Sequence, residues 1–563
     1  MSANPQVRAD TIIYNGPIWC GYEEGTVEAL AIWQGKVLAT GTREQIWSLK
    51  GDETHLINLQ GRFATPGLND AHLHLLLVGL TLDWVDATPQ TAPTLDRLLN
   101  IIRDKAATVS PGAWIKARGY DQTKLDVGRH PHKSELDAVA PNNPVLLERA
   151  CGHVAIFNSR AFELAGVDEK TPVPDGGLIE QRNGQLTGMV AENAQQVVLK
   201  TIPKPSTEEM IAAIEAAGKL LLSYGITSVM DAAVGQVAGF EEIRAYTLAK
   251  LQKRLPVRTW LVLLQDGQSM VQKCYEAGLV SGVGDDMLTV GAVKIFLDGS
   301  AGGRTAWMSR PYVGEDDNVG VQILQDAELA ALVLDAHSKG YQLACHAIGD
   351  AAIGQLITAY EKALAAHPDP DRRHRIEHCG FSTPEQHERM RKAGIYPCPQ
   401  QVFIYDFGDA YISVLGPDRA LSSYPLKTWK DLGFKPATGS DSPVCDPNPY
   451  PNIYSMLTRK TCEGTVMDAS ERVTIEEALQ VYTEYGAFSQ KLEHVKGKLV
   501  PGQAADIAVF SRNMLIATPE DILKDTRCVM TLLAGEVVFE RTADIRGFGE
   551  LEKAQPAPRS ANW

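Results

Sequence analysis

Three features are missing from this chain of 563 residues: paired cysteines, a secretory leader and a long apolar run. The nine cysteines are scattered singly, without a C-x-x-C pair, which favours reduced thiols over a disulfide framework. The first residues, MSANPQVRADTIIYNGPIW, contain no basic segment followed by an apolar one, and runs such as AALVLDAH are too short to span a bilayer. We therefore expect a cytoplasmic protein that does not insert into a membrane.

Positive charge is also in short supply. Lys and Arg total 54 against 69 Asp and Glu, which gives a formal net charge of −15. Binding to nucleic acid or to an anionic membrane needs a basic surface, so we expect neither partner. The remaining composition, 44% hydrophobic and 22% charged, is that of an ordinary globular protein.

Eight strand-like runs recur through the middle of the chain. Helical stretches such as EEMIAAIEAAGKLLLSYG lie between most of them, which is the pattern of parallel βα units. Eight such units predict an α/β fold built on a (β/α)8 barrel of the TIM type. The expected strands are TPGLNDAHLH (65–74), ITSVMDA (226–232), RTWLVLL (258–264), AVKIFLDG (292–299), QLACHAIG (342–349), RIEHCG (375–380), IYPCPQQ (395–401) and KPATGSD (435–441).

The two ends of the chain differ from this middle. Both contain short alternating runs with glycine at the turns, which predicts one small β-sandwich assembled from the two ends. A long segment with its own strands and helices follows the first barrel strand, and we expect it to form an inserted domain over the barrel mouth. The expected division is 1–64 and 489–545 for the sandwich, 65–80 and 206–488 for the barrel, 81–205 for the insertion and 546–563 for a loose tail.

Side chains able to bind a metal recur where the expected strands end. Random placement of 13 histidines would give well under one H-x-H pair, and the sequence has two. The pair His130/His132 lies in the polar stretch RHPHKSEL, which predicts a surface loop. Active sites of barrels form at the carboxyl ends of the strands. Five expected strands carry polar groups there: His72 with His74, Lys294, His346, His378 and Asp441.

These residue types suit a divalent metal such as zinc. Neutral imidazole and carboxylate are zinc ligands, and an H-x-H pair on a strand directs both rings to one face. The pKa of a buried lysine shifts readily, and a neutral amine can react with CO2 to give a carbamate that bridges two ions. A metal lowers the pKa of a bound water, and a nearby aspartate can take that proton and return it to a leaving group. The sequence therefore predicts one or two metal ions per chain.

The order HxH … K … H … H … D resembles the amidohydrolase superfamily. Its family-3 branch, which includes the N-substituted formamide deformylases, is similar in TPGLNDAHLH, VKIFLDGSAGGRTA, CHAIGDAAI, HRIEHCG, ATGSDSPV and VPGQAADIAVF. The likeness covers nearly the whole chain, including GYDQTKLDVGRHPHKSELDAVAP and ACGHVAIFNSRAF of the expected insertion. GYDQ stands where relatives often have a tryptophan, and ACGH stands where they often have an acidic residue before the glycine. Both departures lie in the expected insertion and bear on substrate choice more than on metal binding.

The resemblance implies a metal-dependent hydrolase, often a homodimer, that cleaves a carbon–nitrogen bond other than a peptide bond in a small, aromatic or N-substituted amide. Asp441 would be the general acid and base for a metal-activated hydroxide. The implied metal ligands are His72, His74 and Asp441 for one ion, His346 and His378 for a second, and carbamylated Lys294 as the bridge. The residues expected to orient the substrate or stabilise the oxyanion are Tyr120, His153 and Arg304.

Three other interpretations stay open. HRIEH (374–378) fits the H-x-x-E-H pattern of a peptidase, which requires a helix and would make Glu377 essential instead of His72. The same metal site could instead serve a deaminase or a decarboxylase. A barrel of this kind could also regulate or scaffold without turnover, because a fold alone does not establish activity.

Overall fold

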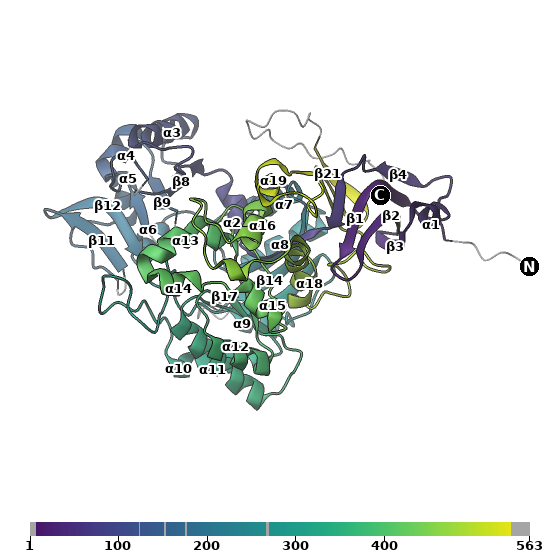
Figure 1. Cartoon of the computed structure of the whole chain (residues 1–563). Helices are drawn as coiled ribbons and strands as arrows, with labels where there is room; N and C mark the ends of the chain where they lie inside the picture. Colours follow the sequence, from purple (N-terminus) through teal and green to yellow (C-terminus); the bar gives the residue numbers. More distant parts are fainter. Residues whose placement is uncertain are drawn as a thin grey trace, which may run out of the picture. The chain divides into compact units, whose positions relative to one another are not determined.

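The computed structural model describes residues 7–541 except 123, 151, 153, 175–176 and 266–269. The chain divides into two compact units (Figure 1): one comprises the chain up to Gly79 together with Thr207 onward, and the other is Leu80–Ser206. The placement of the second unit over a barrel mouth stays a prediction.

A parallel sheet of seven strands forms the centre of the first unit (Figure 1), in the order β18-β17-β16-β15-β14-β13-β6. Every residue of β13 is buried, as expected of a strand covered on both faces. The strands are β6 (Leu68–Leu73), β13 (Ile226–Val234), β14 (Arg258–Leu264), β15 (Leu288–Lys294), β16 (Gln342–Ala347), β17 (Arg375–His378) and β18 (Tyr396–Cys398).

Helices alternate with these strands, as the βα pattern predicts. Those between the strands are α7 (Thr207–Leu222), α8 (Glu241–Leu251), α9 (Met270–Glu276), α10 (Asp326–Ser338), α11 (Asp350–Ala366) and α12 (Pro384–Ala393). Those after β18 are α13 (Val402–Leu415), α14 (Pro417–Leu421), α15 (Leu426–Asp431), α16 (Pro449–Thr458), α17 (Ile475–Tyr482), α18 (Glu484–Ser489) and α19 (Pro519–Asp525). The fold is therefore α/β with parallel strands.

The eighth expected strand, 435–441, is wrong as a regular strand, but its backbone lies beside β6. Ala71 N donates to Thr438 O at 2.9 Å, and Asp441 N donates to His72 O at 2.7 Å. On the other side of this segment, the Thr438 hydroxyl donates at 3.0 Å to Pro399 O, the carbonyl directly after β18. The segment thus lies between the first and last strands, and the seven-stranded barrel is nearly closed.

Strands from both chain ends join one eight-stranded sheet, in the order β21-β20-β19-β5-β1-β2-β3, with β4 on β1. β5 pairs antiparallel with β19, so Ala64 lies opposite Val509. The strands are β1 (Thr11–Gly21), β2 (Gly25–Trp33), β3 (Lys36–Gly41), β4 (His55–Asn58), β5 (Phe63–Pro66), β19 (Ile507–Phe510), β20 (Cys528–Leu533) and β21 (Glu536–Glu540), with α1 (Arg43–Trp47) after β3. A sandwich arrangement of this sheet stays a prediction.

The second unit has a sheet and a core of its own. Its six strands run in the order β11-β12-β10-β9-β8-β7. Leu98, Ile102, Leu136 and Leu147 are fully buried in one apolar cluster of this unit. Its strands are β7 (Val85–Asp86), β8 (Ile115–Tyr120), β9 (Val145–Arg149), β10 (Val154–Phe157), β11 (Gly177–Arg182) and β12 (Gln185–Glu192). Its helices are α3 (Leu95–Thr108), α4 (Lys133–Val139), α5 (Ser159–Ala165) and α6 (Gln195–Leu199). The helix α2 (Leu75–Thr81) begins in the first unit, and its last residues belong to the second.

The sequence predicts neither membrane-spanning helices nor disulfide bonds, and both features can be examined in the described residues. Within those ranges, no helix combines the length and apolar character that crossing a bilayer would require. The eight cysteines that fall in those ranges are all free thiols.

A relay of buried histidines links α10 to the start of β17. His374 Nδ1 accepts a hydrogen bond from Leu343 N at 3.0 Å, so its Nε2 carries the proton and donates to His337 Nδ1 at 3.0 Å. His337 Nε2 donates in turn to His367 O at 2.7 Å. In each of these two rings, one nitrogen accepts and the other donates a hydrogen bond, so both rings are in the neutral form. Burial lowers the pKa of His374 well below its usual range and also lowers the pKa of His337.

We expect this relay to make the protein less stable as the pH falls below about 6.5, the ordinary histidine value. The unfolded chain binds protons at these two histidines more readily than the folded chain, so unfolding takes up protons and stability rises with pH across that window. Each proton contributes a slope of about 1.4 kcal/mol per pH unit. Urea unfolding midpoints between pH 5 and 7.5 measure the effect.

The double variant H337N/H374N isolates this contribution from that of the other histidines. Its midpoint should vary less with pH than that of wild type, whereas His55→Gln, at an exposed strand residue, should leave the profile unchanged. An identical pH profile for the double variant and wild type would contradict the prediction.

Candidate metal site

The H-x-H pair meets the predicted aspartate where β6 ends. His72 Nε2 lies 3.3 Å and His74 Nε2 lies 3.2 Å from Asp441 Oδ1. Asp441 has a φ of 56°, a left-handed backbone that non-glycine residues seldom adopt and that is often found at functional sites. Two imidazoles of one segment therefore converge on one carboxylate oxygen of a distant segment.

Two further histidines stand beside this group. His346 lies near the end of β16, and His378 is the last residue of β17. Their ring centroids are 4.4 Å apart, and the His72 and His378 centroids are 4.9 Å apart. One potential ligand atom from each of His72, His378 and Asp441 lies within 4.8 Å of the other two. The structure thus joins the two predicted ligand sets into one cluster.

Lys294 ends β15 and is almost completely buried. Its Nζ lies 4.7 Å from the ring centroid of Phe296, a ring that also contacts His346 at 5.3 Å between centroids. Burial lowers the pKa of Lys294, although the negative charges of Glu377 and Asp441 act in the opposite direction. Only the neutral amine reacts with CO2, and a lowered pKa increases the fraction of lysine in that form.

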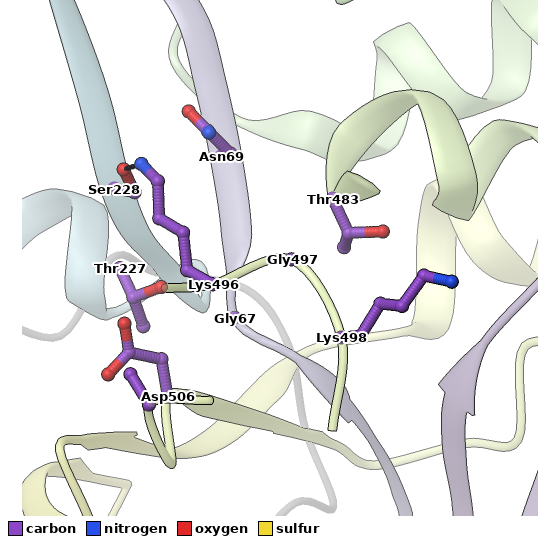
Figure 2. A pocket seen from close by; sticks show the side chains of 10 residues that line it. Gly67, Asn69, Thr227, Ser228, Thr483, Lys496, Gly497, Lys498 and Asp506 are labelled. Atoms are coloured by element: carbon purple, nitrogen blue, oxygen red, sulfur yellow. Dashed lines mark hydrogen bonds between the residues drawn. The ribbon is translucent and has the colours of Figure 1, made fainter. Parts of the chain in front are cut away.

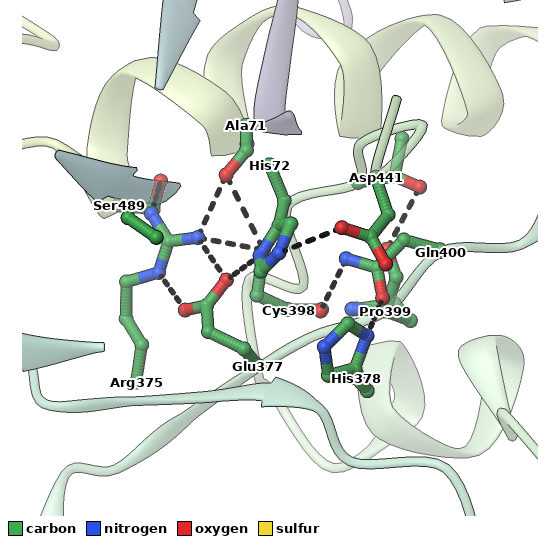
Figure 3. Close-up of polar contacts among 12 residues, drawn as sticks. Ala71, His72, Arg375, Glu377, His378, Cys398, Pro399, Gln400, Asp441 and Ser489 are labelled. Atoms are coloured by element: carbon green, nitrogen blue, oxygen red, sulfur yellow. Dashed lines mark hydrogen bonds and ion pairs between the residues drawn. The ribbon is translucent and has the colours of Figure 1, made fainter. Parts of the chain in front are cut away.

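Three histidines of the cluster each contact an acceptor through one ring nitrogen, and Figure 3 shows the contacts of His72 and His378. The pairs are His72 Nδ1 with Glu377 Oε2, His378 Nδ1 with Gln400 Oε1 (2.5 Å), and His346 Nε2 with Asp298 Oδ1 and the Gly299 carbonyl (3.2 Å each). These partners are acceptors, so the contacting nitrogen of each ring carries the proton. When a ring of this kind is neutral, its opposite nitrogen keeps the lone pair that a metal ligand needs.

Glu377 is fully buried and paired with an arginine of the same strand. Arg375 Nε donates to Glu377 Oε1 at 2.8 Å, and Nη2 donates to Oε2 at 2.9 Å. Burial alone would raise the pKa of Glu377, but Arg375 and His72 lower it to about 2. Glu377 is therefore a carboxylate at neutral pH and can only accept from His72.

The donor set fits a divalent metal. Among the buried polar atoms that the structure describes, His72 Nε2 and His74 Nδ1 have no hydrogen-bond partner, and an unpaired buried polar atom costs free energy. Burial lowers the pKa of His378 well below its usual range, so this ring is neutral. Imidazoles beside a carboxylate are a typical zinc donor set, and zinc binds them in their neutral form.

The three predicted substrate-binding residues are placed differently. Tyr120 is fully buried in the core of the second unit, with its hydroxyl 2.8 Å from His130 Nδ1. Arg304 pairs with Glu315 at 2.6 Å. His153 lies outside the described residues. A role in substrate binding stays a prediction for all three.

The peptidase interpretation of HRIEH is wrong, because these residues are not helical. Arg375–His378 forms β17, and the preceding His374 belongs to the relay with His337. Glu377 nevertheless contacts the cluster, which the barrel interpretation missed. Its signal in the sequence was an acidic residue directly before a predicted ligand histidine.

Comparisons with known proteins agree with this geometry. The model of the Amidohydrolase family matches residues 55–539. The protein YtcJ of Bacillus subtilis is 31% identical over 94% of this chain and 99% of its own, and the N-substituted formamide deformylase of Arthrobacter pascens is 26% identical over 92% and 95%. The crystal structure of an uncharacterized metal-dependent hydrolase from Pyrococcus horikoshii superposes with a TM-score of 0.75 at 26% identity, covering 91% of this chain and 99% of that one.

Proposed function

This chain belongs to the amidohydrolase family, and from that membership and the geometry of its site we propose that it hydrolyses a carbon–nitrogen bond other than a peptide bond in a small molecule. The observation that carries the proposal is the convergence of His72 and His74 on Asp441. A divalent metal held there, which we propose to be zinc, would lower the pKa of a water and polarise the substrate carbonyl.

Asp441 is proposed to carry the proton during the reaction. Burial alone would raise its pKa, but the contacts with His72 and His74 hold the pKa well below its usual range. The carboxylate is therefore ionised at neutral pH and able to accept the proton of the attacking water. It would then deliver that proton to the departing nitrogen.

We propose two metal ions per chain, with Lys294 as the bridging carbamate. His72, His74 and Asp441 would hold one ion, and His346 and His378 the other. The burial and lowered pKa of Lys294 support this role. The small-molecule substrate, the homodimer and the cytoplasmic location stay predictions from the sequence, as does the absence of nucleic-acid and membrane partners.

An N-substituted or aromatic amide is the proposed substrate class. Phe403 stacks on His378 with ring centroids 5.9 Å apart and planes 10° apart, and Phe407 lies 5.3 Å from Phe403. Phe403 is buried in an apolar cluster against which Phe407 packs, and apolar side chains beside His378 suit a substrate with an apolar nitrogen substituent. A panel of N-substituted formamides, acyl amides, lactams and carbamates should reveal amine release that stops with a chelator and returns with zinc. Ammonia released from an amino-substituted ring would instead indicate deamination, and CO2 released from a free carboxylic acid would indicate decarboxylation. No turnover of any panel member would favour a non-catalytic barrel.

Metal content tests the proposed site without a substrate. Protein prepared with bicarbonate should contain about two metal ions per chain by plasma mass spectrometry, following the bridged site of known two-metal hydrolases. Lys294→Ala should retain one or none, because the bridge is lost. Lys392→Ala, at a lysine 70% exposed on α12, should match wild type.

The alternatives give different metal contents. One ion in both wild type and Lys294→Ala would indicate a mononuclear site without a lysine bridge. No metal in folded wild type would overturn the hydrolase proposal.

A further inference from the structure

We propose that Arg375 and Glu377 are a positioning pair that fixes the tautomer of His72 and strengthens it as a metal ligand. The inference rests on the metal site proposed above. It assigns a role toward the metal to two buried charges that do not themselves belong to the proposed ligand set.

The pair holds both the ring of His72 and the backbone next to it (Figure 3). Glu377 Oε2 contacts His72 Nδ1, while Arg375 Nη2 donates to the same carboxylate oxygen at 2.9 Å. The same Nη2 donates at 2.8 Å to Ala71 O, the carbonyl directly before His72. Movement of the guanidinium would therefore disturb the ligand at two points.

The local backbone brings Glu377 into the site beside a ligand from its own strand. Successive residues of a strand normally point to opposite faces. His378 has a φ of 69°, a left-handed value, and this turn lets Glu377 and His378 both approach His72. A backbone outlier that costs free energy is more consistent with a functional requirement than with packing alone.

The pair is also a poor device for stability alone. Arg375 and Glu377 have side chains 1% and 0% exposed, so both charges have lost their hydration. Buried ion pairs of this kind are often no more stabilising than apolar side chains of the same size. A carboxylate behind a ligand histidine, in contrast, typically raises metal affinity.

Two double variants separate positioning from packing. R375M/E377Q removes both charges but leaves an amide oxygen to accept from His72, and R375M/E377M removes the acceptor as well. The probe is zinc itself, titrated into the apo full-length chain in competition with a chromogenic chelator. We expect zinc to bind about 10–100-fold more weakly to the Met variant, with the Gln variant in between.

A matched control uses another Arg–Glu pair of the same unit. Arg389 and Glu361 pair at 2.6 Å with side chains 32% and 36% exposed, so R389M/E361M should bind zinc like wild type. If either site variant does not fold, Glu377→Asp replaces it, because it keeps the charge beside Arg375 and withdraws the carboxylate from His72.

The outcomes distinguish this inference from the proposed function. Wild type without zinc affinity would overturn the metal site itself. Wild-type zinc affinity in folded R375M/E377M, or in Glu377→Asp where that variant is needed, would leave the metal site standing and overturn the positioning role.

Discussion

Asp441→Asn is expected to lower kcat by about 10²–10⁴-fold, the usual contribution of a general acid–base residue. Asparagine preserves the size of the side chain and one oxygen, but it has no charge with which to take a proton from water. Because the pKa of Asp441 is held well below its usual range, wild type has the ionised form throughout the neutral range. Initial rates on the best amide of the substrate panel measure the loss.

Asp441 is proposed both to bind the metal and to transfer the proton. The metal content of the same preparations shows how much of the loss of kcat comes from weaker metal binding. Asp441→Asn that keeps its metal but not its rate would assign the loss to proton transfer, and loss of both would assign it to metal binding. Asp317→Asn, at an exposed loop residue, is the control for an Asp-to-Asn change. Wild-type kcat for Asp441→Asn would remove this residue from the mechanism.

The sequence predicts the parallel strands well because their runs are apolar and separated by helical periods. Seven of the eight expected runs form strands, and RTWLVLL matches β14 from Arg258 to Leu264. The eighth run fails because Pro436 lacks a backbone donor and Gly439 is pressed against β6. A Cβ on Gly439 would lie 2.4 Å from His72 N, a close approach that depends on a tertiary contact and leaves no periodic signal.

The candidate ligands could be predicted because each follows a recognisable strand. The hydrogen-bond partners of these histidines could not be predicted, because they lie in segments without the residue spacing of a metal-binding motif. Gln400 follows β18, and Asp298 follows β15. Strand alternation alone would place Glu377 on the face opposite His378. The left-handed backbone at His378 brings Glu377 into the site instead. No sequence pattern predicts this backbone conformation.

A second buried ion pair fastens the barrel to the sheet built from the chain ends. Arg258 at the start of β14 donates through Nε to Asp506 Oδ2 at 2.6 Å and through Nη2 to Oδ1 at 3.0 Å. Asp506 directly precedes β19, and its Oδ1 also accepts from Ala534 N at 2.8 Å. The two side chains are 6% and 5% exposed, so each charge depends on the other.

A third charge lies near this pair. Figure 2 shows the Lys496 side chain directed along β13 to Ser228, next to a cavity of about 10 Å³ that Asp506 also lines and that has room for about one water. Burial, with Arg258 as the second cause, lowers the pKa of Lys496 to about 7, and Asp506 acts against this shift. Asp506 thus pairs directly with Arg258 and also favours the charged form of Lys496.

Asp506→Ala is therefore expected to reduce the free energy of unfolding by about 3–5 kcal/mol, the cost of leaving one member of a buried pair unpaired. Urea unfolding followed by fluorescence measures the loss. The double variant R258M/D506L removes both charges and should recover most of it, because the stranded guanidinium is gone. Asp371→Ala, at a carboxylate 64% exposed in its pair with Arg373, should cost at most about 1 kcal/mol, as surface pairs do. Equal losses for Asp506→Ala and the double variant would contradict the argument, since the cost would then lie in the lost contacts between β14 and β19 and not in an unpaired charge.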